Sequence, residues 1–172
     1  RIDLVRKMMG EEFQLSPSPA RPAPPPAAAP LLETFQLGHS GSIRAFDLAI
    51  RPGEVLGLAG LLGSGRSEIA RLLFGLDEAD TGALRIAGRD LPHHSPGQAV
   101  RLGLAMIPED RARQGIVAGL SLRENIVLAL QARQGITHYL PPARQRAIAT
   151  HFIQALGIKA VDAEMPIEQL SG

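Results

Sequence analysis

The chain has 172 residues, 45% of them hydrophobic and 3% aromatic, with a net charge of +1 at pH 7. Such a composition supports one domain with a mostly aliphatic core, and it argues against base stacking on aromatic platforms or a broad nucleic-acid-binding surface. The chain contains no cysteine, which excludes disulfides and thiolate metal sites, and no apolar run approaches the roughly 20 residues that span a bilayer.

Residues 1–30 differ in composition from the rest of the chain. A weak helical pattern covers residues 2–13, and a proline-rich stretch follows it. Proline fixes φ and removes a backbone donor, so this stretch favours an extended polyproline spacer. We therefore predict that residues 1–15 are the tail of a preceding domain, 16–30 a linker, and 31–172 the globular part.

Strand patterns open the globular part. Residues 31–37 and 43–50 are expected to pair through a hairpin-like connection. Two short apolar runs, residues 55–59 and 104–107, are each typical of a strand buried on both faces. A further strand is predicted at residues 83–87.

Residues 60–67 have the sequence Gly-Leu-Leu-Gly-Ser-Gly-Arg-Ser and fit the phosphate-binding loop pattern, except that Arg66 stands where lysine belongs. Glycines let the backbone approach phosphate oxygens, and backbone N–H groups at a helix N-terminus bind the anion. Ser67 holds the position at which a hydroxyl coordinates Mg²⁺. Residues 67–74 are predicted as the helix, with Gly75 as its C-cap. The alternative is a glycine-rich strand-to-helix turn without a ligand.

Helices are predicted in the second half of the chain. Ser95 and Pro96 are typical of an N-cap and a first helical residue, and Ser121 with Glu124 forms a capping box that begins another helix. A longer helix is predicted from about residue 142 to 156. Its inward face is expected to comprise Ile148, Phe152, Ile153 and Leu156.

Five segments, taken in order, carry a resemblance to a known family. They are Arg51–Gly60, Gly63–Glu68, Ile107–Arg111 followed by Gly115, Ser121–Ile126, and Leu170–Gly172. Their order resembles the nucleotide-binding domain of an ABC transporter. It is most similar to the second domain of the tandem ATPase subunit of bacterial monosaccharide importers of the ribose, xylose and galactose type. In that family the phosphate-binding loop of the second domain has arginine in place of lysine. Glu-Asp-Arg replaces the usual glutamine of the Q-loop, and Leu170–Gly172 would begin the signature motif.

The resemblance implies an α/β fold: part of a P-loop NTPase (ABC ATPase) domain, with a small antiparallel β region, a P-loop βα core and a helical insert. It also implies ATP and Mg²⁺ as cofactors. Arg66 would bind the β- and γ-phosphates, Ser67 and Glu109 would ligate Mg²⁺, and His39 would lie near the adenine. The implied nucleotide-binding residues are Gly60, Leu61, Gly63, Ser64, Gly65, Arg66, Ser67, Glu68, Glu109 and His39.

Three of these residues have alternative interpretations. Arginine is larger than lysine and planar, so the exchange at Arg66 is not conservative, and binding could persist while hydrolysis suffers. Glu109 could ligate the metal, repel phosphate or be a solvated loop charge, and Arg111 could neutralise it or face water. His39 could instead be a surface turn residue.

The implied function is that of an energy-coupling ATPase domain for monosaccharide import, at the cytoplasmic face of the bacterial inner membrane. The implied partners are the other nucleotide-binding domain, the membrane permease and, indirectly, a periplasmic sugar-binding protein, with no nucleic acid. In the family the Walker B aspartate, the catalytic glutamate and the switch histidine follow the signature motif. We therefore assign no catalytic residue, expect little or no hydrolysis from these 172 residues alone, and expect exposed sheet edges to favour homo-oligomers.

Two alternatives stay open. One is a degenerate, non-hydrolysing regulatory module, which the exchanges at Arg66 and Glu109 favour. The other is an unrelated P-loop kinase or GTPase, although no guanine-specifying Asn-Lys-x-Asp sequence occurs. The sugar is not identified, because in the family specificity lies in other subunits.

Overall fold

The computed structural model describes residues 28–135 and 138–170. The predicted tail of a preceding domain, most of the proline-rich linker, and Ser171 and Gly172 of the signature-like ending lie outside the described residues. Within the described ranges, no helix has the length and apolar character needed to cross a membrane.

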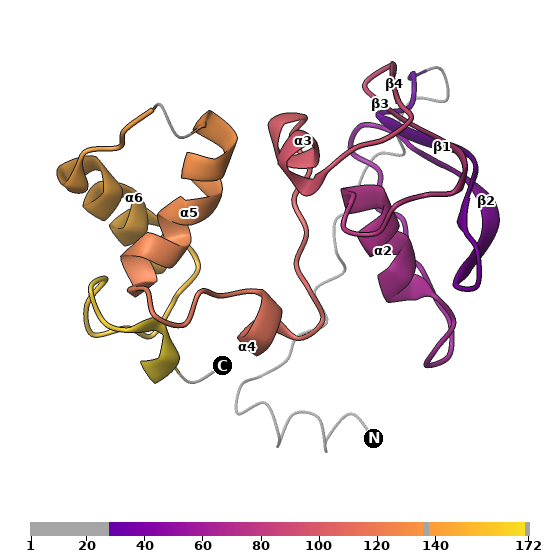
Figure 1. Cartoon of the computed structure of the whole chain (residues 1–172). Coiled ribbons are helices and arrows are strands. Elements are labelled where there is room, and N and C mark those ends of the chain that lie inside the picture. Colours follow the sequence, from indigo (N-terminus) through magenta and orange to yellow (C-terminus); the bar gives the residue numbers. More distant parts are fainter. Residues whose placement is uncertain (1–27, 136–137, 171–172) are drawn as a thin grey trace, which may run out of the picture.

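A four-stranded antiparallel sheet forms one side of the molecule (Figure 1). Its order is β2-β1-β3-β4, and the strands are β1 (Leu32–His39), β2 (Ile43–Ile50), β3 (Thr81–Ile86) and β4 (Arg89–Leu91). The predicted β1–β2 pair is confirmed, with His39 opposite Ile43 at the turn. The short β4 is not foreseen by the sequence, because three residues are too few to show alternation.

A bulge in β1 bends this strand before its last residues. Gly82 of β3 has φ +77°, and a Cβ there would lie 2.1 Å from the carbonyl oxygen of Gln36. The close approach falls where the β1–β3 register shifts, between Phe35 and Gly38. Because a bulge bends its strand and re-aims the residues beyond it, this feature determines where His39 leaves the sheet.

The helix α2 (Arg66–Phe74) packs on the sheet through Leu72. Leu72 is 1% exposed and belongs to the buried core, together with Leu37, Leu84 and Ile86. Gly75 ends the helix as predicted, in a left-handed conformation with φ +80°. Full burial of a leucine side chain contributes about 1.5–3 kcal/mol. This contact therefore holds α2, and with it the end of the loop 60–67, against the sheet.

The two apolar runs predicted as buried strands are not strands in the structure. Residues 55–59 and 104–107 have no strand partner within the described ranges, and Val55 and Ile107 are 79% and 84% exposed. A strand buried on both faces needs neighbouring strands to complete its hydrogen bonds and outer layers to cover it. The described residues supply no strand partner, and although Leu104 packs against the core, most residues of the two runs are exposed. This prediction is therefore wrong for the described structure.

The helices α5 and α6 lie on the opposite side of the molecule from the sheet, with α4 on the connection between the two sides (Figure 1). Beyond α2, the helices are α3 (Pro96–Arg101), α4 (Arg111–Gln114), α5 (Leu122–Gln134), α6 (Pro142–Ala155) and the 3₁₀ turn η1 (Ile167–Gln169). Both predicted caps are confirmed, since capping boxes begin α3 at Ser95 and α5 at Ser121.

The inward face of α6 differs from the prediction. Gln145 is buried, whereas Phe152 and Leu156 are 44% and 71% exposed. Nε2 of Gln145 donates to the carbonyl of Leu140 at 2.7 Å, and its Oε1 accepts a hydrogen bond from Arg123. Because both ends of the amide are bonded, a polar side chain can face inward here, which apolar periodicity alone does not anticipate.

Candidate functional site

The loop 60–67 has a backbone that only glycine accommodates easily. Gly63 and Gly65 have φ values of +78° and +89°, in the left-handed region that other residues rarely adopt. At Gly60 the limit is space, because a Cβ there would lie 2.2 Å from Oγ of Ser64. Residues 60–64 are exposed, with Leu61 at 86%, whereas Gly65 is buried, so most of the loop stands at the surface.

The loop ends in an uncapped helix start. Gly65 is the N-cap of α2 and has no side chain to bond the first-turn N–H groups. The first backbone bond of the helix runs from the N–H of Ile69 to the carbonyl of Gly65, at 2.8 Å. The N–H groups of residues 66–68 therefore have no intrahelical partner, and they coincide with the positive end of the helix dipole. Loop and helix together offer N–H groups of the kind that can bind an anion.

Ser67 and Glu109 meet at this helix start. The Ser67 hydroxyl donates a hydrogen bond to Oε2 of Glu109 at 3.0 Å, although 42 positions separate the two residues. A hydroxyl and a carboxylate are oxygen ligands of the kind that Mg²⁺ prefers. Within residues 28–135 and 138–170, no cluster of three histidine, aspartate or glutamate side chains could hold a metal by itself. A metal here would therefore need further oxygens from a ligand or water.

Arg66 and Arg111 are both exposed near this point. Neither side chain has a hydrogen bond or ion pair with another residue of the described part, so Glu109 is not neutralised by Arg111 there. The Cδ of Arg66 lies 3.7 Å from the position that a Cβ on Gly60 would take, so the stem of Arg66 crosses the start of the loop. Glu68, the remaining predicted site residue, is exposed in the first turn of α2.

His39 lies on the rim of a hollow beside the loop. Residues 39–44 line this hollow, which has a volume of ≈ 430 Å³. Ile43 joins it to the loop, because its Cδ1 lies 2.6 Å from the position that a Cβ on Gly65 would take. Nδ1 of His39 is 2.8 Å from the carbonyl oxygen of Glu78. Since a carbonyl can only accept, Nδ1 carries the proton.

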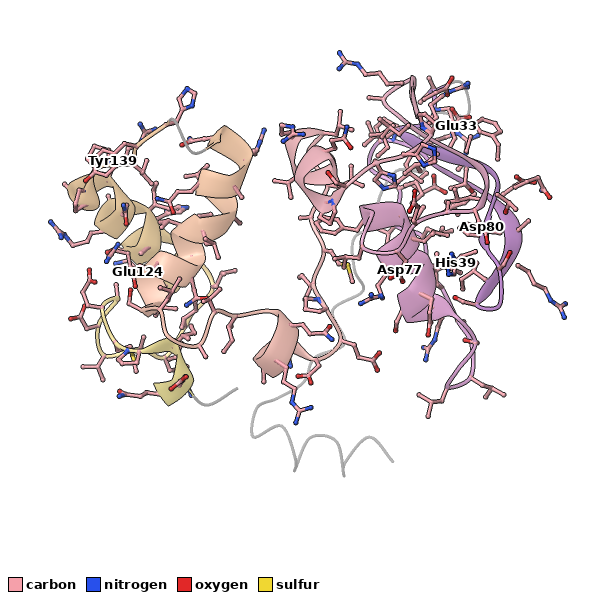
Figure 2. The ribbon with its side chains drawn as sticks, in the orientation of Figure 1. Glu33, His39, Asp77, Asp80, Glu124 and Tyr139 are labelled. Atoms are coloured by element: carbon pink, nitrogen blue, oxygen red, sulfur yellow. The ribbon has the colours of Figure 1, made fainter. Side chains whose placement is uncertain are left out.

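Two carboxylates stand close to the hollow. The guanidinium of Arg71, hydrogen-bonded to Asp77, lowers the pKa of that carboxyl, and hydrogen bonding from Ser40 lowers the pKa of Asp80. Both carboxylates are therefore ionised at neutral pH. Figure 2 shows His39, Asp77 and Asp80 gathered beside α2.

The structure thus brings Glu109 to Ser67 at the end of the loop, and it places His39 in the lining of a hollow that Ile43 joins to Gly65. Sequence analysis missed the residues 40–44 that line the hollow and the Asp77 and Asp80 contacts around it. These residues carry no motif, and their role depends on contacts between segments far apart in the chain.

Residues 43–172 match the family model described as ABC transporter. Over 172 residues the chain is 44% identical to the galactofuranose transporter ATP-binding protein YtfR of Escherichia coli (strain K12), covering 100% of this chain and 34% of that protein. It is 44% identical over 147 residues to the ribose import ATP-binding protein RbsA of Pseudomonas putida, covering 86% of this chain and 29% of that protein. The chain therefore spans about a third of the length of the curated relatives it matches.

A solved structure is similar in fold. It is a dimeric, post-hydrolysis state of the ATP-binding cassette MJ0796 bound to ADP and Pi, with a TM-score of 0.67 and 16% sequence identity. The match covers 81% of this chain and 63% of that one. At this identity the likeness concerns the fold alone, and it agrees with a P-loop NTPase domain of the ABC ATPase type.

Proposed function

Because the match over residues 43–172 shows that the chain belongs to the ABC transporter family, we propose that it is part of a nucleotide-binding domain that binds Mg-ATP. The observation that carries the proposal is the loop 60–67, with its two left-handed glycines and its uncapped helix start. Backbone N–H groups of the loop and of residues 66–68 bind the phosphates. The exposed guanidinium of Arg66 reaches the β- and γ-phosphates.

Mg²⁺ is proposed to bind at Ser67 and Glu109. Their hydrogen bond of 3.0 Å supports this, because both oxygens already lie at one point beside the helix start. The ATP phosphates and water would complete the octahedral set of ligands that Mg²⁺ requires. The carboxylate of Glu109, which lacks a cationic partner in the described part, then gains one in the metal.

The base of the nucleotide is proposed to lie in the hollow lined by residues 39–44. Ile43 supports this placement, since it joins the hollow to Gly65 and thus to the phosphate loop. The imidazole of His39 would contact the base by stacking. Residues 60–68, Glu109 and His39 thereby form one site for the phosphates, the metal and the base.

In the intact protein we propose that this domain supplies the energy for monosaccharide import. Relatives named as ATP-binding proteins of galactofuranose, ribose and fructose transport support that role. The domain would be the second of a tandem ATPase and would pair with the first. It would contact the permease at the cytoplasmic face of the inner membrane, act indirectly with a periplasmic sugar-binding protein, and hydrolyse ATP there. The exposed apolar side chains of Val55, Leu56, Leu58 and Ile107 favour self-association of the chain in isolation.

A second candidate function is a regulatory module that binds nucleotide without hydrolysing it. Arg66 in place of lysine favours it, because a planar guanidinium positions the γ-phosphate differently from an ammonium. ATP hydrolysis by an Arg66→Lys variant of the intact protein separates the two functions. A rise in turnover would mean that Arg66 impairs hydrolysis at this site and would support the regulatory module. An unchanged rate would mean that the site hydrolyses ATP with arginine, or that it contributes little to the total hydrolysis of the protein.

Thermal unfolding tests the proposed binding function. A ligand at 100 times its Kd stabilises the folded state by about 2.7 kcal/mol, which corresponds to a rise in Tm of roughly 5–10 °C for a chain of this size. The 172-residue chain is therefore expected to melt at a higher temperature with Mg-ATP than with magnesium sulfate at equal ionic strength. Equal melting temperatures under the two conditions would contradict nucleotide binding.

A further inference from the structure

Residues 75–80 form a short strap between the end of α2 and the turn that joins β1 to β2. At its first end, the N–H of Leu76 bonds the carbonyl of Arg71 at 2.9 Å, directly after the helix ends at Gly75. At its other end, the N–H of Asp80 bonds the carbonyl of Gly38 at 3.1 Å. The strap thus connects the helix that follows the phosphate loop with the residues that border the hollow.

A two-point ion pair holds the strap to α2. Nε of Arg71 donates to Oδ2 of Asp77 at 2.8 Å, and Nη2 donates to Oδ1 at 2.7 Å. Bidentate guanidinium–carboxylate pairs fix orientation as well as distance, because two parallel bonds resist rotation. The hydrogen bond from Arg71 also lowers the pKa of Asp77, so the pair stays charged well into the acid range. The position of Asp77 is therefore set by the phosphate-loop helix.

The residue after Asp77 holds the ring of His39. Nδ1 of His39 donates to the carbonyl of Glu78 at 2.8 Å. A second contact follows, in which the N–H of Ser40 donates to Oδ2 of Asp80 at 2.8 Å. The imidazole is therefore oriented by the strap and not by the sheet from which it emerges.

This bond also selects the tautomer of His39. With the proton of the neutral ring on Nδ1, the lone pair lies on Nε2. The ring borders the hollow in which the proposed function places the base. Any shift of Glu78 would turn the ring and move that lone pair.

We propose that Arg71 and Asp77 are positioning residues for the nucleobase: the pair fixes the strap, and the strap orients His39 toward the base of a bound nucleotide. The inference rests on the proposed function, and it adds two residues that lie outside the phosphate and metal contacts. It predicts that the pair affects binding of the base but not of the phosphates. It also predicts that the effect passes through His39.

Calorimetric titration of the 172-residue chain with two probes, Mg-ATP and Mg-tripolyphosphate, separates base from phosphate binding. Arg71→Gln is expected to weaken Mg-ATP binding about fivefold, as partial loss of one stacking contact would, and to leave Mg-tripolyphosphate binding within about twofold. Arg85→Gln is the matched control. Arg85 also pairs with an aspartate, Asp90, at 2.6 Å, and its side chain is 37% exposed, against 39% for Arg71. Its pair lies on β3 and β4, away from the strap, so both affinities should stay unchanged.

A double-mutant comparison tests whether the effect passes through His39. In a His39→Ala background, Arg71→Gln is expected to cause no further loss of Mg-ATP affinity, because the ring that it positions is gone. An additive loss in that background, or an equal loss for tripolyphosphate, would overturn the inference and indicate a general effect on the fold. A wild-type chain that binds neither probe would contradict the proposed function itself. A wild-type chain that binds both, with Arg71→Gln unchanged, would contradict only the positioning role.

Discussion

The hydroxyl of Ser67 donates a hydrogen bond to Oε2 of Glu109 at 3.0 Å, which joins the first turn of α2 to the residue before the N-cap of α4. α4 in turn lies on the connection to the α5–α6 side of the molecule (Figure 1). A ligand that binds between these two oxygens therefore acts on both the phosphate loop and the segment that leads to the helices. A metal at this point would link nucleotide binding to the position of that segment.

Replacement of either oxygen ligand should weaken the dependence of nucleotide binding on magnesium. We expect Ser67→Ala and Glu109→Ala each to reduce about tenfold the ratio of ATP affinity with Mg²⁺ to that with EDTA, since each removes an oxygen that orients or binds the metal. Calorimetric titrations under the two conditions give the ratio. Glu109→Gln keeps an oxygen at the same place but loses the negative charge that attracts the metal, so its ratio should lie between those of Glu109→Ala and wild type. A wild-type ratio in both alanine variants would rule out a metal at this point.

Arg66 should affect nucleotides according to their phosphate number. Its side chain is exposed and has no partner in the described part, so its removal should disturb little else. We expect Arg66→Ala to weaken Mg-ATP binding about tenfold, as loss of a charge-assisted hydrogen bond would. AMP lacks the β- and γ-phosphates, and its binding should not change. Arg66→Lys should restore part of the ATP affinity. Equal losses for ATP and AMP would mean that Arg66 shapes the loop instead of contacting the distal phosphates.

The stability of the chain should fall in acid. Hydrogen bonds and ion pairs lower the pKa values of several carboxyl groups, namely Asp77, Asp80, Asp90 and Glu124. A carboxyl whose pKa is lower in the folded than in the unfolded state contributes stability above its ordinary pKa, which is 3.8 for aspartate and 4.5 for glutamate. That contribution is lost as the pH falls through the folded pKa. The free energy of unfolding in urea should therefore be nearly constant from pH 7 to about 5 and then decrease.

Asp77→Asn is the informative variant for this pH dependence. It should be less stable than wild type at pH 7, because the bond to Arg71 loses its charge, and its stability should decrease less between pH 5 and pH 3. The same urea titrations at each pH provide the comparison. If its acid profile runs parallel to that of wild type, Asp77 does not contribute to the pH dependence.

The capping box of α5 should contribute measurably to stability. Oγ of Ser121 accepts from the N–H of Glu124 at 3.2 Å, and Oε2 of Glu124 accepts from the N–H of Ser121 at 2.8 Å. We expect Ser121→Ala to lower the free energy of unfolding by about 1 kcal/mol. Urea unfolding measures the loss, and Ser121→Asp, which keeps an acceptor at the N-cap, should recover most of it. A full loss in the aspartate variant would point to a role other than capping.

The parts of the fold that sequence analysis predicted are those set by neighbours in the chain. The glycines of the loop 60–67, the cap at Gly75 and the capping boxes at Ser95 and Ser121 each depend on residues a few positions apart. The errors concern distant partners. Residues 55–59 and 104–107 have the composition of buried strands, but burial depends on neighbours that the described residues do not provide. Gln145 faces inward because of Arg123 and Leu140, which no periodicity reveals.

In the candidate site, too, the features set by neighbours in the chain were predicted and those set by distant contacts were not. The phosphate loop is a local motif, and Glu109 could be linked to it only through a family resemblance. The ion pair of Arg71 with Asp77 has no motif. Its role appears only when the carbonyl of Glu78 is found 2.8 Å from His39.

The most direct test of nucleotide binding by the loop is calorimetric titration of the chain with Mg-ATP, comparing wild type, Gly63→Asp and Gly63→Asn. Gly63 is the best position for the change, because a Cβ there would meet no atom within 4 Å, whereas at Gly65 it would meet Ile43 at 2.6 Å. Aspartate and asparagine both tolerate the left-handed backbone that Gly63 adopts, so the two variants differ mainly in charge. We predict binding by wild type, weaker binding by Gly63→Asn, and none by Gly63→Asp, whose carboxylate repels the phosphates. Equal binding by all three proteins would contradict a phosphate site in the loop.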